Sequence, residues 1–275
     1  MSQAKAKIKI GILGCGAIGS RIAHYIRTTR VPKACISAVF DIDHERATVL
    51  ARSIPAKNVL KKSFQEFLTS CDLVVEAVNA ADTDQLIRKA LLAQCDVLVM
   101  SVGKLIGKES LFDLAQRNKR SLIIPSGAIA GIDAIKAASL GKIKSITLTT
   151  RKPLAGFAGN AYLRSKRIDL TKIKAQKVLF NGTVSQAVKA FPQNINVAAT
   201  ISLACRSTTK LKVCIVTSPR FKVNSHEIEL SGSFGHIITR TDNVPCLDNP
   251  KTSYLAVLSA MQALKQYINR FKIGT

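Results

Sequence analysis

Short apolar runs alternate with amphipathic stretches through the first 125 residues of the chain. The apolar runs are Ile8–Leu13, Ile36–Phe40, Leu73–Ala77, Val97–Val102 and Leu122–Pro125. The stretches between them have helical spacing and cover residues 17–28, 46–53, 63–70, 83–92 and 108–118. Strands that are apolar throughout and alternate with helices are typical of a parallel sheet covered on both faces. The pattern therefore predicts an α/β fold with a doubly wound parallel sheet.

The pattern changes after residue 130. Four segments alternate apolar and polar positions and predict antiparallel strands, namely residues 145–152, 212–218, 226–232 and 233–240. Helices are predicted on both sides of Pro192, within residues 185–205, and over residues 131–140. Gly141 is expected to end the latter helix in a left-handed conformation. This half of the chain therefore predicts an α+β domain.

The last segment, residues 249–271, predicts one long helix with Asn249 as its N-cap and Pro250 in its first turn. Such a helix can return to pack on the first domain. We therefore expect two domains, one of residues 1–130 plus 241–275 that contains the parallel sheet, and an α+β domain of residues 131–240.

A glycine-rich turn follows the first predicted strand and has the pattern G-x-G-x-x-G. Gly14 permits the tight turn, Gly16 lets a pyrophosphate approach the backbone, and Gly19 lets helix and strand pack closely. Ala17 and Ile18 begin the predicted helix, whose first N–H groups attract phosphate. The motif in this context predicts a Rossmann domain that binds a dinucleotide.

Asp41 ends the second predicted strand, 22 residues after Gly19, which is close to the spacing of an acid that binds the cofactor ribose. Its carboxylate would repel a 2′-phosphate and so favours NAD, whereas Arg46 leaves NADP open. A place for Asp41 in the capping region of the next helix is the alternative. The expected cofactor is NAD or NADP.

The ends of the other strands are expected to line the same crevice, because ligands of such sheets bind at the carboxyl ends of the strands. Ala77 follows the third predicted strand, and residues 101–103 and 126–130 follow the next two. Their small side chains would let a nicotinamide lie close to the backbone. Ordinary loop residues would give the same composition.

His226 lies in the segment FKVNSHEIEL, which alternates like a strand. It shares a face with Ile228 and Leu230, so it is either a hydrogen-bonded core residue or an acid/base group with a pKa near neutrality. Asn224 lies on the same face and could orient the histidine or a substrate. These residues alone leave both readings of His226 open.

Asn194 and Asn196 stand at the start of an apolar helical segment. Buried amides need hydrogen-bond partners, and the carboxamide of nicotinamide would be one. Capping of the helix by Asn194 is the alternative.

Charge and cysteine content narrow the class of protein. The 41 Lys and Arg residues against 17 Asp and Glu give a formal net charge of +24, which attracts anions of every kind. The basic residues are spread along the chain without a nucleic-acid motif, so a solvated basic surface is favoured over nucleic-acid binding. No apolar run approaches the about 20 residues of a membrane span. The seven cysteines form no C-x-x-C pair, which argues against a metal site and for the reducing cytoplasm.

Several motifs together resemble the L-aspartate dehydrogenase family, in the right order and over nearly the whole chain. The segments are GILGCGAIGSRIA, LVVEAVNA, VLVMSVGKL, PSGAIAGIDAIKAA, TTRKP, FNGTVSQAVKAFPQNINVAATISLA, NSHEIELSGSFG and NPKTSYLAVLSAMQALK. The most specific are SGAIAGIDA, FPQNINVAA and the N-x-H strand, whereas many families share the glycine motif.

The resemblance implies NAD(P)-dependent oxidation of L-aspartate to iminoaspartate, which hydrolyses to oxaloacetate and ammonia or feeds NAD biosynthesis. It implies that His226 is the catalytic acid/base, and that Ala130 and Asn196 contact the nicotinamide. The two substrate carboxylates need cationic partners. The candidates by motif position are Arg151, Lys152 and Lys251. We also expect a homodimer.

Two other functions stay open at this point. One is another reductase of the aspartate pathway with the same two-domain plan, of the homoserine dehydrogenase or dihydrodipicolinate reductase type. The other is a basic protein that senses NAD or binds nucleic acid and has lost catalysis. An intact N-x-H strand argues against the second.

Overall fold

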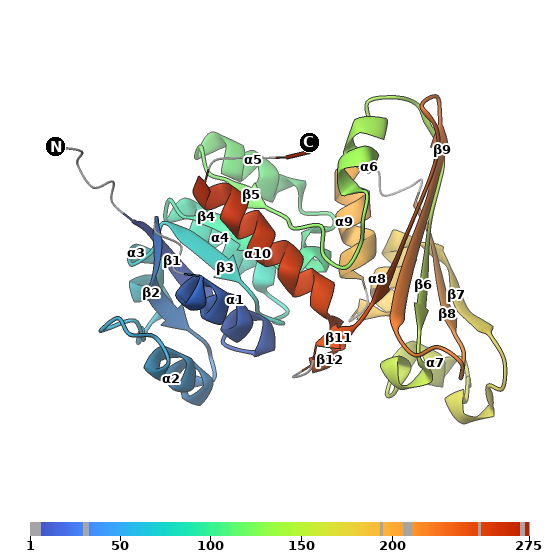
Figure 1. The fold of residues 1–275 in the computed structure, drawn as a ribbon, viewed down its shortest axis with the longest axis horizontal. Coiled ribbons are helices and arrows are strands. Elements are labelled where there is room, and N and C mark those ends of the chain that lie inside the picture. The colour runs from blue at the N-terminus through green and yellow to red at the C-terminus, as the bar shows by residue number, and fades with distance from the viewer. Residues whose placement is uncertain are drawn as a thin grey trace. The chain divides into compact units, whose positions relative to one another are not determined.

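The computed structural model describes residues 7–29, 33–192, 195–205, 211–246, 249–269 and 273–274. The chain divides into two compact units, whose elements are labelled in Figure 1. Unit 1 comprises Met1–Pro125 and Val257–Lys272, and unit 2 comprises Ser126–Ala256 and Ile273–Thr275. The boundaries therefore fall after Pro125 and after Ala256, where the sequence predicted residues 130 and 240.

Unit 1 is built on a five-stranded parallel sheet with the order β2-β1-β3-β4-β5. The strands are β1 (Ile8–Leu13), β2 (Ala34–Phe40), β3 (Leu73–Glu76), β4 (Asp96–Val99) and β5 (Leu122–Ile123). All four residues of β3 are buried, as expected of a central strand with both faces covered. The doubly wound parallel sheet predicted from the apolar runs is confirmed.

Helices cover this sheet. They are α1 (Ala17–Thr28), α2 (His44–Arg52), α3 (Phe64–Thr69), α4 (Thr83–Leu92), the 3₁₀ turn η1 (Val102–Leu105), α5 (Glu109–Arg117) and α10 (Tyr254–Asn269). Ile22 of α1 and Leu264 of α10 join Ile12 of β1 in one buried cluster. A Cβ at Gly11 would lie 2.7 Å from the Phe67 ring, so the glycine lets α3 approach β1 closely. The last helix thus completes the core of unit 1.

Unit 2 contains a second five-stranded sheet, with the order β10-β9-β6-β8-β7. The strands are β6 (Ile143–Lys152), β7 (Lys177–Thr183), β8 (Leu211–Thr217), β9 (Asn224–Gly232) and β10 (Gly235–Asn243). The sequence predicted four of these strands and missed β7, and the expectation that the four are all antiparallel is wrong for one pair, because β6 and β8 run parallel. The chain between them contains helices and β7, which return it to the same end of the sheet, as a parallel pair requires.

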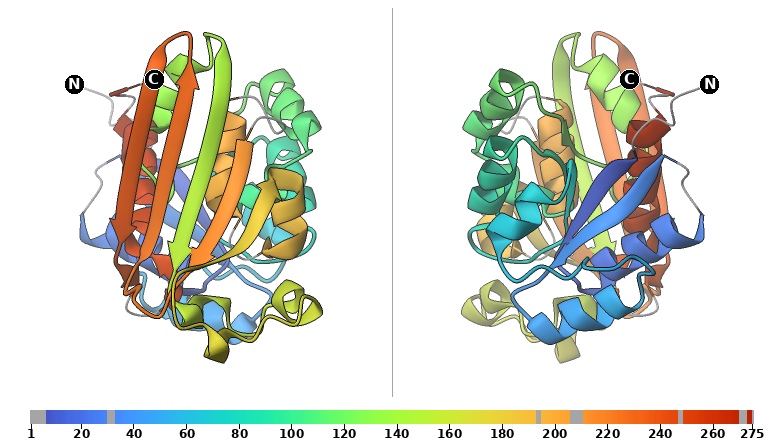
Figure 2. Two further views of the ribbon diagram at one scale, coloured as in Figure 1. Left: turned by 90° about the vertical axis from the view of Figure 1, so that its right-hand side faces the viewer. Right: turned by 90° about the vertical axis from the view of Figure 1, so that its left-hand side faces the viewer.

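The remaining elements of unit 2 are short. They are α6 (Ile132–Ala138), η2 (Leu154–Phe157), α7 (Ala161–Ser165), η3 (Leu170–Lys172), α8 (Val184–Ala190) and α9 (Asn196–Ala204). The left view of Figure 2 looks onto one face of the sheet, and α6 and α9 lie on the other. The helices predicted on both sides of Pro192 are confirmed as α8 and α9.

Two details of the sequence prediction need correction. Gly141 does not have a positive φ, and α6 ends through right-handed Ser139. The left-handed glycine stands instead before α6, at Gly131 with φ +82°. The last helix begins at Tyr254 and not at Asn249. Residues 249–253 form the strand β12 (Asn249–Ser253), which pairs with β11 (Pro245–Cys246), and this pairing overrides the local signal for a helix.

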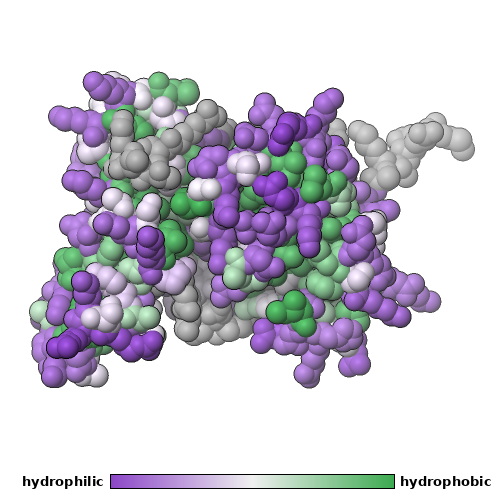
Figure 3. All heavy atoms as spheres, turned by 180° about the vertical axis from the view of Figure 1, so that it is seen from behind, coloured by the Kyte–Doolittle hydropathy of each residue, from purple (hydrophilic) through white to green (hydrophobic). Residues whose placement is uncertain are grey.

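Hydrophilic side chains predominate on the face of the molecule drawn in Figure 3, with hydrophobic ones scattered between them. Among the described residues, no helix has the length and apolarity that crossing a membrane requires.

Candidate active site

The glycine-rich turn joins β1 to α1, and two of its glycines are needed for close backbone approach. Gly14 has φ +94°, and a Cβ there would lie 2.6 Å from the carbonyl oxygen of Ala77. A Cβ at Gly19 would collide with the carbonyl oxygen of Gly14. Gly16 differs, because a Cβ there would have no neighbour within 4 Å. Its φ of −71° also suits any residue.

The open space beside Gly16 suits the pyrophosphate of a dinucleotide. Gly16 is the N-cap of α1 and provides no side chain to cap the helix, and the first turn, which begins with Ala17 and Ile18, has no acidic residue. The N–H groups of that turn and the positive end of the helix dipole are therefore directed at this space. The turn fits a bound NAD or NADP.

Asp41 is joined to this turn. Its Oδ2 accepts a hydrogen bond from the backbone N–H of Cys15 at 2.6 Å, and its Oδ1 accepts one from Asp43 at 2.9 Å. The N-cap of α2 is Asp43, whose side chain accepts from the N–H of Arg46. Asp41 therefore lies where an acid that binds the ribose is expected, and the neighbouring aspartate caps the helix.

A buried carboxylate shapes the ends of β3 and β4. Glu76 is fully buried, and its oxygens accept hydrogen bonds from the N–H groups of Val78, Met100 and Ser101 and from the Ser101 hydroxyl. Burial raises its pKa, and these hydrogen bonds act in the opposite direction. Glu76 thus ties the loop that follows β3, including Ala77, to the loop that follows β4.

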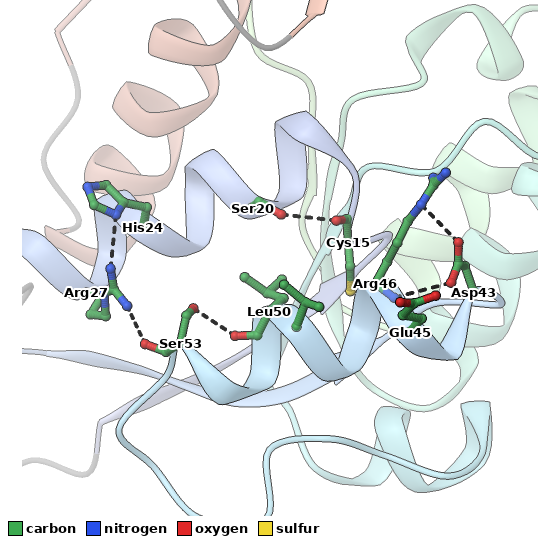
Figure 4. Close-up of a pocket in the computed structure, with 10 residues that line it drawn as sticks. Cys15, Ser20, His24, Arg27, Asp43, Glu45, Arg46, Leu50 and Ser53 are labelled. Carbon is green, nitrogen blue, oxygen red and sulfur yellow. Dashed lines mark hydrogen bonds and ion pairs between the residues drawn. The ribbon is translucent and has the colours of Figure 1, made fainter.

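A pocket of about 530 Å³ lies between α1 and α2, beside the turn (Figure 4). Arg27 contributes from α1, and Arg46 from α2. The Nε of Arg46 lies 2.9 Å from Asp43, and Arg27 donates to the carbonyl oxygen of Ser53. The pocket therefore presents both cationic and anionic side chains next to Cys15. This mixture is compatible with either NAD or NADP.

The segment that carries Ala130 is held by β10 within unit 2. The carbonyl oxygen of Ala128 accepts hydrogen bonds from the Thr241 hydroxyl at 2.8 Å and from the Asn243 amide at 3.0 Å. The carbonyl oxygen of Ala130 accepts one from the Thr239 hydroxyl at 3.1 Å. These bonds fix the backbone around the predicted nicotinamide contact, although Ala130 itself is exposed.

His226 is a buried residue on β9. Its Nδ1 lies 3.1 Å from the hydroxyl of Thr150, which stands directly opposite on β6. Burial, and secondarily the charge of Lys152, lower its pKa to about 3. The imidazole is therefore neutral at physiological pH and is fixed through one ring nitrogen.

Lys152 and Asn224 lie on the same face of the sheet as His226. Lys152 is only 8% exposed, and burial lowers its pKa to about 8. Asn224 is also buried. The alternation of β6 and β9 and the pairing of Thr150 with His226 put these side chains on one face. The structure thus brings together three of the sequence-predicted site residues.

The other predicted site residues of unit 2 are placed differently. Arg151 lies on the opposite face of the sheet, where its Nη2 is 3.3 Å from the carboxylate of Glu227. Asn196 is the first residue of α9 and is exposed. Lys251 belongs to β12, and its side chain is outside the described part of the structure, as is the whole of Asn194.

Sequence reasoning missed several residues that shape these sites, namely Thr150, Thr241 and Asn243. They gave no signal, because their partners depend on the register of strands far apart in sequence. Glu76 was expected at the crevice as part of the strand end of residues 76–79, but its hydrogen bonds to the loop after β4 were not foreseen. Among the described residues, no cluster of three or more His, Cys, Asp or Glu side chains could hold a metal ion.

Unit 1 has a doubly wound sheet, a glycine-rich turn suited to phosphate and an acid after β2. Unit 2 carries a buried histidine. Together these features define the class of nicotinamide-nucleotide-dependent oxidoreductases. Two family models agree with this class. Residues 14–125 match the description "Homoserine dehydrogenase, NAD binding domain". Residues 133–267 match "Aspartate dehydrogenase, C-terminal". These matches support NAD or NADP as the cofactor.

Curated relatives identify the family. The chain is 43% identical over 271 residues to an L-aspartate dehydrogenase of Methanosarcina mazei, which covers 98% of this chain and 100% of the relative. It is 42% identical over 272 residues to one of Methanococcus maripaludis, with the same coverage. The chain belongs to the L-aspartate dehydrogenase family, as its motifs indicated.

Solved structures agree on the fold. The aspartate dehydrogenase of Thermotoga maritima is 24% identical, with a TM-score of 0.72, and the match covers 97% of this chain and 99% of that one. A homoserine dehydrogenase of Thiobacillus denitrificans is 12% identical, with a TM-score of 0.61 and 96% and 73% coverage.

Proposed function

We propose that this protein oxidises L-aspartate at C2 to iminoaspartate, which hydrolyses to oxaloacetate and ammonia. The observation that carries this proposal is the buried row of Thr150, His226 and Lys152 in a chain whose full length aligns with L-aspartate dehydrogenases. NAD or NADP, when bound, supplies the hydride acceptor.

The residues of unit 1 bind and orient the dinucleotide. Gly14, Gly16 and Gly19 shape the turn, and the α1 N-terminus with Ala17 and Ile18 receives the phosphates. Asp41 accepts hydrogen bonds from the ribose hydroxyls. The backbone of Ala77 lies against Gly14 and borders the cofactor site there. The candidates for contact with the nicotinamide end belong to unit 2, and they are Ala130, Asn194 and Asn196.

The residues of unit 2 handle the amino acid. His226 is the catalytic residue, and its bond to Thr150 through Nδ1 leaves Nε2 for the substrate. Asn224 and Lys152 bind the substrate on the same face. Arg151 and Lys251 remain candidates for a carboxylate, with Arg151 the weaker because it already faces Glu227.

We further propose a cytoplasmic homodimer whose product serves NAD biosynthesis. All seven cysteines are free thiols, which suits a reducing compartment. One face of the unit 2 sheet is uncovered in Figure 2 and carries ion pairs such as that of Arg151 with Glu227. A second copy of the chain would cover this face. Light scattering of the purified protein tests the proposal: the mass of two chains supports the dimer, and the mass of one chain contradicts it.

The test of the reaction is the absorbance of reduced nicotinamide, with purified protein, L-aspartate and either NAD or NADP at mildly alkaline pH. We expect reduced cofactor from L-aspartate and none from D-aspartate or homoserine. Turnover of homoserine instead would identify the alternative reductase. A protein that binds NAD in a thermal shift assay but turns over no amino acid would have lost catalysis.

A further inference from the structure

Unit 2 contains a further pocket, which lies between α7, the edge strand β7 and α8. Its volume is about 600 Å³, and pockets that hold small molecules have about 300–1,000 Å³. We call it the α7–α8 pocket, and the lining residues that matter below are Tyr162, Lys166, Phe180, Asn181 and Lys189. None of its lining residues belongs to the glycine-rich turn or to the row of Thr150, His226 and Lys152. The pocket is therefore separate from the residues proposed for aspartate oxidation.

One wall of the α7–α8 pocket is a cluster of aromatic rings. The centroid of the Tyr162 ring lies 6.0 Å from that of Phe180, at an interplanar angle of 78°, and 5.4 Å from that of Phe191. Phe180 and Phe191 also contact each other, at 5.8 Å. The two phenylalanines are buried, whereas Tyr162 is half-buried. The contacts fix the orientation of the Tyr162 ring, and this ring presents more surface to the pocket than the other two.

Two cations stand beside this ring. Lys166 comes from the C-cap of α7 and Lys189 from the last turn of α8, and both are exposed. The Nζ of Lys166 lies 5.9 Å from the centroid of the Tyr162 ring. Among the described residues that line the pocket, none is acidic, and none of the ion pairs found in the described part of the chain involves either lysine. The pocket thus combines an aromatic surface with two positive charges that carboxylates leave free.

The chain around the pocket is strongly basic. Asp169 is the only acid in residues 158–190, and its Oδ1 already accepts hydrogen bonds from the N–H and the hydroxyl of Thr171. The basic residues of this stretch are Arg164, Lys166, Arg167, Lys172, Lys174, Lys177 and Lys189. A field of one sign around a pocket raises the local concentration of ligands of the opposite sign. The ligand that complements this pocket is therefore an anion.

We propose that the α7–α8 pocket binds a mononucleotide, with the base against the Tyr162 ring and the phosphate between Lys166 and Lys189. Nucleobases stack on aromatic side chains through a face that every base has. Ammonium groups form charge-assisted hydrogen bonds with phosphate oxygens. The amide of Asn181, exposed on β7, has both a donor and an acceptor for the edge of a base. This binding site goes beyond the proposed function, because none of these residues takes part in it.

A free mononucleotide fits the pocket better than a nucleic-acid strand does. Proteins that bind single strands place several aromatic side chains along a basic groove, so that successive bases stack on successive rings. Here Phe180 and Phe191 are buried under Tyr162, which leaves one ring for one base. The pocket therefore offers the contacts of a single nucleotide unit.

The test observes Tyr162 directly and does not involve turnover. The chain has four tyrosines, so ¹³C labelling of the tyrosine rings gives few signals, and the signal of Tyr162 is the one that Tyr162→Phe lacks. The protein is saturated with NAD, so that the glycine-rich turn is occupied, and is then titrated with AMP, GMP, CMP and UMP. We expect at least one of them to shift the Tyr162 signal until it saturates, while the signal of Tyr267, in unit 1, stays in place. A Tyr162 signal that none of the four shifts overturns the proposal.

A pair of double variants tests the contribution of the two lysines. Lys166→Gln combined with Lys189→Gln should weaken binding of the mononucleotide about 10-fold or more, because the phosphate loses both cations. Lys142→Gln combined with Lys144→Gln removes the same charge at exposed positions of unit 2 and should keep the wild-type affinity. Thermal melts of both variants check that the exposed substitutions leave the fold intact. Equal affinity of the two double variants overturns the proposal.

The two halves of the ligand and a longer nucleic acid complete the experiment. Adenosine and inorganic phosphate, titrated separately, should each bind at least about 10-fold more weakly than the best mononucleotide, since each meets half of the site. A single-stranded oligonucleotide that shifts the Tyr162 signal where no mononucleotide does, with an affinity that falls steeply with salt, would identify a nucleic-acid surface and overturn the mononucleotide site. Because L-aspartate is absent from these titrations, their outcome is independent of the proposed reaction.

Discussion

The backbone N–H of Cys15 donates to Oδ2 of Asp41, and this bond joins the glycine-rich turn directly to the end of β2. Both carboxylate oxygens of Asp41 have a backbone donor, yet each oxygen can accept a further hydrogen bond. The carboxylate is thus oriented in advance of the ribose hydroxyls, which reduces the ordering that cofactor binding requires.

Asp41→Asn should shift the enzyme from NAD toward NADP. The amide removes the negative charge that repels a 2′-phosphate, and Arg46 in the adjacent pocket can then approach it. We expect kcat/KM for NAD to fall about 10-fold or more and the NADP/NAD ratio to rise by a similar factor. Steady-state kinetics with both cofactors measure this. Asp113→Asn, at an exposed position on α5, should leave the ratio unchanged, and an unchanged ratio in Asp41→Asn would remove its assigned role.

Two glycine variants separate binding from folding. Gly16→Val fills space that has no protein neighbour, so it should block the dinucleotide phosphate while leaving the free energy of unfolding nearly unchanged. Gly19→Ala collides with the Gly14 backbone and should destabilise the protein by about 1–3 kcal/mol. Urea unfolding and NAD titration by fluorescence distinguish the two. Equal losses of stability would contradict the distinction.

His226→Asn should lower kcat for aspartate oxidation about 10²-fold or more, because the substrate loses its imidazole partner. NAD binding should stay within about twofold of wild type, since the glycine-rich turn and Asp41, which are proposed to hold the phosphates and the ribose, lie in unit 1. Isothermal titration with NAD, run beside the kinetics, checks both statements. Loss of NAD binding together with activity would assign His226 to the core instead.

The same histidine should make stability depend on pH. Its folded pKa of about 3 lies below the ordinary value of 6.5, so the unfolded chain takes up a proton that the folded chain does not. The contribution of His226 to the free energy of unfolding is therefore fully present above pH 6.5. It is lost as the pH falls toward 3, by at most about 1.4 kcal/mol per pH unit. Thermal melts from neutral to acid pH should therefore fall less steeply for His226→Asn than for wild type. The exposed His44→Asn should melt in parallel with wild type.

Glu76→Gln should loosen the loops that follow β3 and β4. A glutamine NH₂ would face one of the N–H donors that now point at the carboxylate, and at least one buried hydrogen bond would be lost. We expect the free energy of unfolding to fall by about 1–3 kcal/mol, measured by urea titration. The exposed Glu109→Gln is the control. A variant as stable as wild type would indicate that the carboxyl group of Glu76 is protonated, and therefore uncharged, in the folded protein.

The first sheet was predictable because each strand and each helix carries its own periodic signal. α1 and α4 match the predicted residues 17–28 and 83–92, and Asp41 follows its strand as the spacing required. The family could also be recognised from the sequence, because its motifs are local segments. His226 was placed on the inward face by alternation alone, and its burial confirms that placement.

What failed depended on long-range pairing. Alternation says that Arg151 and Lys152 point to opposite faces, but only the register with β9 shows that Lys152 shares the face of His226. The start of the last helix was missed for the same reason, because β12 exists only through its pairing with β11. The sequences of β6 and β8 contain no local signal that distinguishes their parallel pairing from an antiparallel one.

The return of α10 to the first sheet has a consequence for how the chain matures. Leu264 and Ile268 complete a buried cluster with Ile10 and Ile12, so β1 acquires its full packing only after α10 has been synthesised. Contacts of such wide sequence separation form slowly. The first 125 residues therefore cannot complete the core of the dinucleotide unit by themselves, and the capacity to hold the cofactor should emerge only after α10 has been made.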